Sequence, residues 1–252
     1  GHGAAVIEDA AQAAGGALHG APLGALASLA VLSFGRGKGT AAGGGGALIA
    51  REERWRAAIA EARELLAPAS RGSATCVRLV AQWALGRPPL YRIPSSVPAL
   101  RLGETVYHAA SEPRAISGCS LGALSAALEC GASDVESRRR LAERYAAAIA
   151  QRPDASLRTG APIPGSAPGY LRFPVLAADG RGAAPDLGIL RGYPRMLTEW
   201  PQSESIAIDR GEALSGSREL ARTLFTLPTH YFVRDRDVVQ ITDWLAASPA
   251  RG

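Results

Sequence analysis

The chain has 252 residues, 47% of them hydrophobic, and its 28 basic and 23 acidic residues give a net charge of +5. A chain of this length can bury roughly 70 to 75% of the surface that its unfolded form exposes, so it needs no disulfide or metal to fold. The basic residues are spread among acidic ones without any nucleic-acid-binding motif, which favours a solvated basic surface over a nucleic-acid partner. Three distant cysteines and four histidines show no metal-ligand spacing, so no metal is assigned and a reducing, cytoplasmic setting is expected.

No run of the sequence approaches the roughly 18 consecutive apolar residues that a membrane helix requires. The N-terminus lacks a basic segment followed by an apolar stretch, so no export signal is indicated. We therefore expect a soluble protein without a membrane partner. Because Gly1-His2-Gly3 leads directly into an apolar segment and no initiator Met is present, we also expect a chain cut just before an element of a larger fold.

The first fifty residues predict strands whose ends carry polar or glycine-rich segments. Residues 4–7 form an apolar run before Glu8-Asp9, and residues 29–34 form another before Gly35-Arg36-Gly37, so both are predicted to be buried parallel strands. A third candidate strand, residues 47–50, leads into a helix predicted at about residues 52–66. Strands alternating with helices predict an open α/β sheet whose ligand site lies at the carboxyl ends of the strands.

The rest of the chain predicts a proline-rich connection over residues 87–113 and then a smaller α+β domain. Periodicity and composition place the elements that follow the connection, in both predicted domains. These are helices at 121–130, 135–149, 185–191 and 217–222, and strands at 170–176 and 223–227. A closing helix is capped by Asp235 and buries Val238, Ile241 and Leu245. Residues 138–140, three consecutive arginines, are predicted to form a solvated helix face. The resulting domains are residues 1–133 and 134–252.

Four polar side chains near the predicted strand ends suit pyridoxal phosphate (PLP) chemistry, which needs an amine, an acid beside the ring nitrogen and phosphate donors. Lys38 lies in a glycine-flanked loop where a planar ring can approach the backbone. Asp9 can face a cationic ring nitrogen, Gln12 follows it by three residues, and Ser33 offers a hydroxyl to a phosphate. Taken singly, each has a plainer reading: an exposed loop lysine, a helix cap from Ala10 onward, a surface glutamine and a strand-end hydrogen bond.

Taken together, the order and spacing of these residues are far more specific. The segments Glu8-Asp9-Ala10-Ala11-Gln12, Ser33-Phe34, Lys38 and Gly43-Gly44-Gly45-Gly46 resemble the signature of the DegT/DnrJ/EryC1/StrS family of aminotransferases. Weaker likeness continues at Arg191-Gly192-Tyr193-Pro194 and at Leu227-Pro228-Thr229-His230. The resemblance is concentrated in residues 4–50.

The resemblance implies an α/β, aspartate-aminotransferase-like fold of PLP-dependent fold type I, with an incomplete large-domain sheet and an α+β C-terminal domain. It implies that Asp9 contacts the pyridine nitrogen, Gln12 the ring, Ser33 the phosphate and Lys38 the aldehyde carbon. The implied activity is transfer of an amino group from an amino acid, such as glutamate, to a keto-sugar nucleotide by a homodimer. Members that remove a hydroxyl carry histidine in place of this lysine, so Lys38 favours transamination.

Two departures and two alternatives accompany this interpretation. The glycine-threonine phosphate loop and the ring-stacking aromatic residue that begin family members do not precede Gly1, and Ala27-Ser28 replaces an acidic residue common in the turn before the second strand. One alternative is a non-catalytic remnant or binding module of the same fold. The other, a nucleotide-phosphate loop around Lys38, fails because Leu32 and Gly39 occupy places where a Walker-type loop needs Gly and Ser or Thr.

Overall fold

The computed structural model describes residues 4–85, 109–152, 156–161, 163–193, 195–201 and 214–247. Their contacts divide the chain into two compact units. Unit 1 holds the described residues up to 139 together with 163–171, and unit 2 holds the remainder from residue 140 onward. Most of the expected proline-rich connection, residues 86–108, lies outside the described ranges, whereas residues 109–113 are described and have no regular structure. Among the described helices, none combines the length and apolarity required to cross a bilayer.

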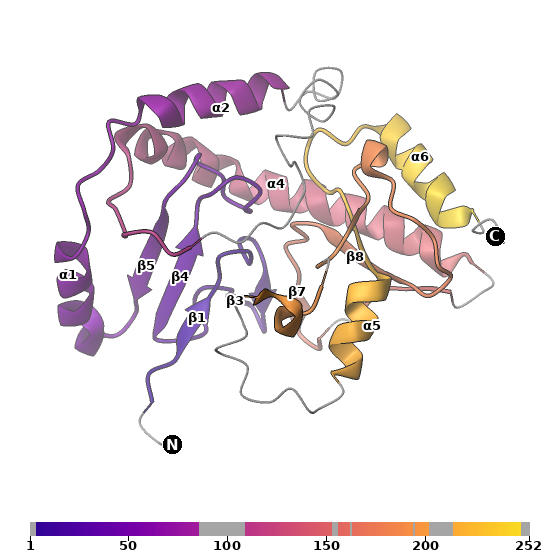
Figure 1. Ribbon diagram of the computed structural model, residues 1–252, viewed down its shortest axis with the longest axis horizontal. Coiled ribbons are helices and arrows are strands. Elements are labelled where there is room, and N and C mark those ends of the chain that lie inside the picture. The colour runs from indigo at the N-terminus through magenta and orange to yellow at the C-terminus, as the bar shows by residue number, and fades with distance from the viewer. Residues whose placement is uncertain are drawn as a thin grey trace. The chain divides into compact units, whose positions relative to one another are not determined.

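Unit 1 is built on a three-stranded sheet in the order β1-β4-β5, whose strands are Ile7–Asp9, Leu29–Ser33 and Gly46–Ala50 (Figure 1). The predicted parallel pairing of the first two strands is confirmed, because Ile7 pairs with Leu29 and Asp9 with Val31. The first strand begins at residue 7 rather than residue 4. The third strand runs antiparallel to β4, with Ser33 opposite Gly46, because the glycine cluster turns the chain straight back along β4.

One face of this sheet is largely open, so the prediction that both parallel strands are buried is wrong for β1. Ile7, Val31 and Leu48 share that face through their register and keep exposed fractions of 58%, 38% and 44%. On the opposite face Ala30 is fully buried. β1 is an edge strand with β4 as its only described strand neighbour, and Ile7 stays more exposed than the residues on the central strand.

A second, smaller sheet in unit 1 joins distant segments of the chain. Strand β2 (Ala17–Leu18) pairs with β3 (Ala21–Pro22) on one side and with β7 (Ser166–Ala167) on the other. The pairing places residues 163–171 against the turn that follows β1.

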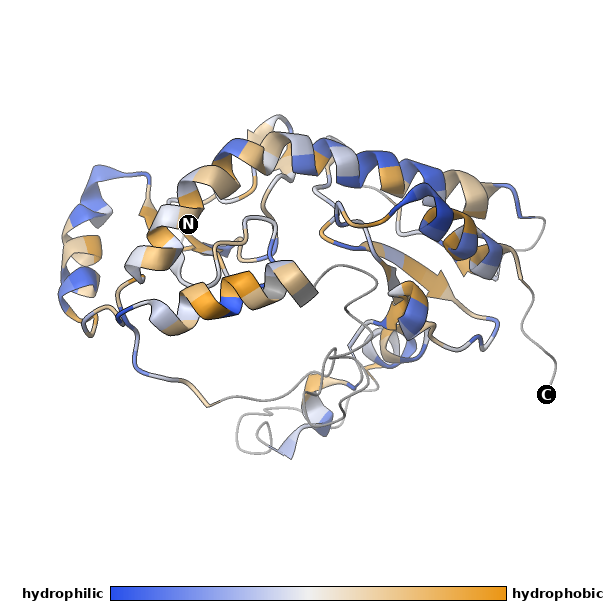
Figure 2. Cartoon of the chain, turned by 90° about the horizontal axis from the view of Figure 1, so that it is seen from above, coloured by the Kyte–Doolittle hydropathy of each residue, from blue (hydrophilic) through white to orange (hydrophobic). Residues whose placement is uncertain are grey.

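The helices of unit 1 differ from the predicted ones in their boundaries. The helix predicted at residues 52–66 is a single 3-10 turn, Glu53–Trp55, followed by α1, Arg56–Glu64. Helix α2, Ser73–Leu85, was not predicted. The helices predicted at 121–130 and 135–149 are one helix, α4, Gly118–Ala150, which alternates hydrophobic and hydrophilic residues along its length (Figure 2). It continues because no proline separates the two segments and Ser133 donates to the carbonyl of Cys130 within the helix.

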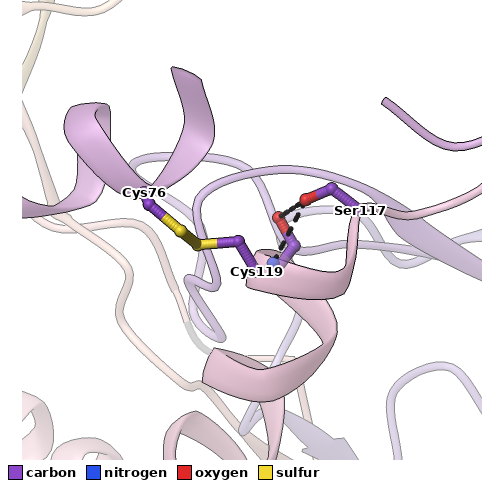
Figure 3. Close-up of a disulfide and its surroundings, with 4 residues drawn as sticks. Cys76, Ser117 and Cys119 are labelled. Atoms are coloured by element: carbon purple, nitrogen blue, oxygen red, sulfur yellow. Dashed lines mark hydrogen bonds between the residues drawn. A yellow bond between two sulfur atoms is a disulfide. The ribbon is translucent and has the colours of Figure 1, made fainter. Parts of the chain in front are cut away.

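A disulfide joins the two helices α2 and α4. Cys76 and Cys119, 43 residues apart in sequence, are bonded beside the first turn of α4 (Figure 3). There Ser117 accepts a hydrogen bond from the N–H of Ser120 at 3.2 Å and so caps the helix. Closing a loop of this length stabilises a fold by about 4 kcal/mol in the chain-entropy estimate. The spacing of the cysteines did not predict this pair, and Cys130 is free and exposed.

Unit 2 is an α+β arrangement around an antiparallel sheet in the order β6-β8-β10-β9. Its elements are β6 Leu157–Arg158, β8 Phe173–Ala177, β9 Leu190–Arg191, α5 Ser215–Thr223, β10 Leu224–Leu227 and α6 Asp235–Ala246. Two 3-10 turns, Pro185–Leu187 and Leu197–Glu199, lie between the strands and α5. The helix predicted at 185–191 is wrong, because Gly188, at φ +71°, ends the turn and the chain enters β9.

The core of unit 2 lies between this sheet, α6 and the end of α4. The predicted buried stripe of Val238, Ile241 and Leu245 is confirmed. Tyr145 is fully buried and donates to the carbonyl of Pro228 at 3.0 Å, and its burial raises its pKa to about 12. The predicted cap is wrong: Asp237, not Asp235, accepts the N–H of Arg234 at 2.9 Å, while Asp235 pairs with Arg144.

Candidate active site

The predicted site residues follow the carboxyl ends of two neighbouring parallel strands. Asp9 is the last residue of β1, Ser33 is the last residue of β4, and Lys38 follows five residues later. Asp9 pairs with Val31, so Ser33, two residues further along β4, presents its side chain on the same face as Asp9. This is the open face that carries Val31 and Leu48.

Asp9 begins a turn and not a helix, so the helix-cap alternative is wrong. One carboxylate oxygen of the exposed Asp9 accepts the N–H of Ala11 at 3.0 Å, and the chain turns with Ala13 donating to the carbonyl of Ala10. The other oxygen has no partner among the described residues. Gln12 lies in this turn with its side chain exposed. The turn therefore leaves a carboxylate oxygen and an amide available for a ligand.

The side chains of Ser33 and Lys38 come close on either side of Gly35. The Gly35 N–H donates to the Ser33 hydroxyl at 3.4 Å, and Lys38 N–H donates to the Gly35 carbonyl at 3.3 Å. A Cβ placed on Gly35 would lie 3.5 Å from Ser33 Oγ and 3.9 Å from Lys38 Cγ. Beside Gly37, which has φ +74°, a Cβ would meet no atom within 4 Å. The Lys38 loop thus has open space next to it, and no described residue pairs with the Lys38 ammonium.

The glycine cluster fixes the base of this loop. Phe34 is buried; its N–H donates to the Gly45 carbonyl, and its own carbonyl accepts the N–H groups of Ala42 and Gly44. Gly43 and Gly45 adopt φ +83° and +87°, and side chains fill the space that a Cβ would need at both positions. Only glycine tolerates this combination of backbone conformation and close packing.

Glu8 is a structural residue of the site that the sequence pattern did not reveal. It points to the face opposite Asp9, where its carboxylate accepts the N–H groups of Gly24, Leu26 and Ala27 at 2.6, 2.8 and 3.3 Å. Burial alone would raise the pKa of Glu8, but these three hydrogen bonds and the charge of Arg51 outweigh it and hold the pKa below its usual value. Glu8 therefore anchors the turn that leads into β4.

We expect Glu8→Gln to destabilise the chain by about 1–2 kcal/mol at neutral pH, because an amide replaces one of the two accepting oxygens. The value lies toward the lower end since the side chain is only half-buried. A carboxyl group whose pKa is lower in the folded than in the unfolded chain stabilises the fold at pH values above its unfolded pKa. This stabilisation is lost as the pH falls through the folded pKa. Urea unfolding at neutral and acidic pH should show this loss in the wild type and not in the variant.

Glu64→Gln is the matched control, because Glu64 is exposed on α1 and has no described partner. It should shift stability by less than about 0.5 kcal/mol. Equal effects of the two substitutions would contradict the anchoring role of Glu8.

The residues at this edge fit the chemistry of PLP. Lys38 supplies an amine beside open space, Ser33 a hydroxyl for a phosphate, and Asp9 a carboxylate oxygen without a partner among the described residues for a ring N–H. The sheet and its polar edge define a class of α/β scaffold whose candidate cofactor site lies at the carboxyl ends of its parallel strands.

Comparison with known proteins agrees with that class. Residues 1–71 match the DegT/DnrJ/EryC1/StrS aminotransferase family. For this segment, the resemblance inferred from its motif is confirmed. No curated protein matches the sequence.

Solved structures share the fold over almost the whole chain. A DegT/DnrJ/EryC1/StrS aminotransferase from Brucella abortus matches with TM-score 0.65 and 18% identity, covering 95% of this chain and 56% of its own. DesV from S. venezuelae, in complex with a ketimine intermediate, matches with TM-score 0.67 and 22% identity, covering 98% and 60%. The aminotransferase TlmJ from Streptoalloteichus hindustanus matches with TM-score 0.65 and 23% identity. The match covers 98% of this chain and 59% of TlmJ. The expected fold type I is confirmed, and the chain spans under two thirds of these structures.

Proposed function

We propose that this chain carries the cofactor-binding edge of a PLP-dependent aminotransferase that transfers an amino group from an amino acid, such as glutamate, to a keto-sugar nucleotide. The observation that carries the proposal is the placement of Lys38. It is the only lysine in the sequence, the other 27 basic residues being arginine, and it lies in the loop after β4. A guanidinium does not condense with an aldehyde, whereas a lysine amine does, so a lysine is required where an amine must react.

Each residue of the edge has a role in this proposal. Bound PLP supplies an electron sink for the carbon–hydrogen bond that transamination breaks. Asp9 holds a proton on the ring nitrogen, Gln12 contacts the ring, and Ser33 donates to the phosphate. The Lys38 amine would hold the cofactor at its aldehyde carbon and, once exchanged for a substrate amine, would serve as the base that moves a proton between the reacting carbons.

The proposed substrate class is supported by one of the structural relatives. DesI, which shares the fold with TM-score 0.65, was solved in the presence of its TDP-sugar product. We propose a nucleotide-linked keto-sugar for this chain too, in polysaccharide or glycosylated-metabolite biosynthesis, with a cytoplasmic homodimer as the working form. In this proposal residues 1–133 hold the cofactor and residues 134–252 form the smaller domain. The alternative is a non-catalytic remnant or binding module of the same fold.

The test uses the single lysine. PLP titrated into the chain should give a saturable visible absorption, and borohydride reduction should then fix the cofactor on Lys38. An endoproteinase specific for lysine cleaves this sequence only after Lys38, so reduction should abolish cleavage. Label on the N-terminal amine, or cleavage unchanged after reduction, would reject cofactor binding at Lys38. Trapping without turnover of any keto-sugar would favour the binding module.

A further inference from the structure

Arg138 is buried beneath the Lys38 loop, although the sequence predicted a solvated face for residues 138–140. Its residue exposure is 7%. From α4 its guanidinium donates to the carbonyl of Gly39 at 3.0 Å and to that of Gly169 at 3.4 Å. Gly39 directly follows Lys38, so this bond fixes the backbone next to the reactive amine. All of these residues belong to unit 1.

The backbone at Gly39 is closely packed on the side where a Cβ would lie. A Cβ at that position would lie 2.8 Å from the Ala14 Cβ, 3.0 Å from the Ala14 carbonyl and 3.3 Å from Arg138 Nη1. The loop is thus held between the turn that carries Gln12 and the guanidinium of Arg138. The same contact fixes two of the proposed ligand-binding segments relative to each other.

The charge of Arg138 has no carboxylate partner among the described salt bridges. Burial lowers the pKa of the guanidinium, and Asp134, one turn earlier on α4, acts in the opposite direction. A guanidinium stays protonated at neutral pH regardless. Its two bonds to carbonyls are therefore charge-assisted, which makes them stronger than bonds between neutral groups.

Arg139 makes a similar set of bonds to a different part of the molecule. It donates to the carbonyls of Gly15 at 3.0 Å, Pro168 at 3.0 Å and Ala167 at 3.2 Å. None of these belongs to the Lys38 loop. Substitutions of Arg139 therefore report on the general stability of unit 1, whereas substitutions of Arg138 also remove the hydrogen bond to the Lys38 loop.

We propose that Arg138 is a positioning residue for Lys38: by holding the Gly39 carbonyl it aims the lysine amine at the aldehyde carbon of the cofactor. This inference rests on the proposed function for the identity of the aldehyde. The hold on the loop itself rests only on the contacts of Arg138.

The experiment compares Arg138→Gln and Arg138→Met with Arg139→Gln and Arg139→Met, none of which adds a lysine. Without cofactor, the rate of lysine-specific cleavage after Lys38 should rise about tenfold in the Arg138 variants, the factor for losing one hydrogen bond to a charged group. With PLP, the rate of borohydride-trapped labelling of Lys38 should fall by a similar factor. The Arg139 variants should change both rates less than about twofold. Variants with similar urea unfolding midpoints are compared, so that a difference in rate does not come from a difference in stability.

Equal rates in the Arg138 and Arg139 variants would overturn the proposal, because they would show a purely structural role. If Arg138→Met does not fold, Arg138→Gln decides, since its amide can still donate one bond. The cleavage arm needs no cofactor. If the wild-type chain binds no PLP, the proposed function is rejected. The difference in cleavage rate between the Arg138 and Arg139 variants then still decides whether Arg138 holds the loop.

Discussion

Lys38→Arg is expected to eliminate the visible absorption that PLP gives with the wild-type chain, and with it all borohydride-trapped label. The substitution keeps the positive charge but replaces a nucleophilic amine with a guanidinium that forms no imine. Stability should change by less than about 0.5 kcal/mol, because no described residue pairs with the Lys38 side chain. Absorption spectra and urea unfolding of the same preparation check both statements.

A double variant, Arg36→Lys with Lys38→Arg, is the sharpest control for this prediction. It returns one amine to the same loop, two residues away, at an exposed position. If placement matters, the double variant should not recover the absorption. Recovery would mean that any amine in this glycine-rich loop reacts with the aldehyde, and the specific role of Lys38 would be lost.

Much of the candidate site follows from local sequence order. Two parallel strands were predicted from apolar runs at residues 4–7 and 29–34. The observed strands end at Asp9 and Ser33, and strand pleating places these two side chains on one face. The role of Glu8 could not be predicted, because its three hydrogen-bond partners lie 16 to 19 residues away in a turn without a distinctive pattern. Local sequence fixes which groups follow a strand, whereas tertiary packing decides which backbone donors they meet.

The failures of prediction have the same origin. Arg138 was assigned to solvent because charged residues in a helix are usually exposed, yet the carbonyl it reaches belongs to Gly39, 99 residues earlier. The helix break expected near Gly131 does not occur, since one glycine weakens a helix by only about 1 kcal/mol. The stripe of α6 was predicted well because its buried residues recur every three or four positions within the helix itself.

Unit 2 depends on one buried ion pair at the end of α6. Arg181 and Asp179 are 2.6 Å apart, with side-chain exposures of 5% and 10%. The same guanidinium donates to the carbonyls of Trp244 at 2.6 Å and Ala247 at 2.9 Å, and it lies 4.6 Å from the centre of the Trp244 ring. Arg181 thus satisfies carbonyl groups that the C-terminus of α6 leaves without partners inside the helix.

Arg181→Met is therefore expected to destabilise unit 2 by about 3–5 kcal/mol at neutral pH, because the buried Asp179 carboxylate loses its charged partner and keeps the Ser156 hydroxyl and the N–H of residue 181 as donors. In the wild type, burial tends to raise the pKa of Asp179, but hydrogen bonds and charge from Arg181 outweigh it and lower that pKa. The pair thus stabilises the fold at pH values above the ordinary carboxyl pKa. This stabilisation is lost as the pH falls through the pKa of Asp179 in the folded chain. In the variant, burial still raises the pKa of Asp179 and Arg181 no longer lowers it. Acidification should therefore narrow the difference in unfolding free energy between variant and wild type.

Urea unfolding followed by circular dichroism at neutral and acidic pH measures this difference. Arg191→Met is the matched control, because Arg191 is exposed on β9, donates to the carbonyl of Arg222 and lies 5.1 Å from the centre of the Phe225 ring, without a carboxylate partner among the described residues. It should lose less than about 1 kcal/mol. Adding Asp179→Asn to Arg181→Met should recover part of the lost stability, since removing the second charge removes the desolvated carboxylate. No recovery, together with equal losses for Arg181→Met and Arg191→Met, would show that the pair does not hold the end of α6.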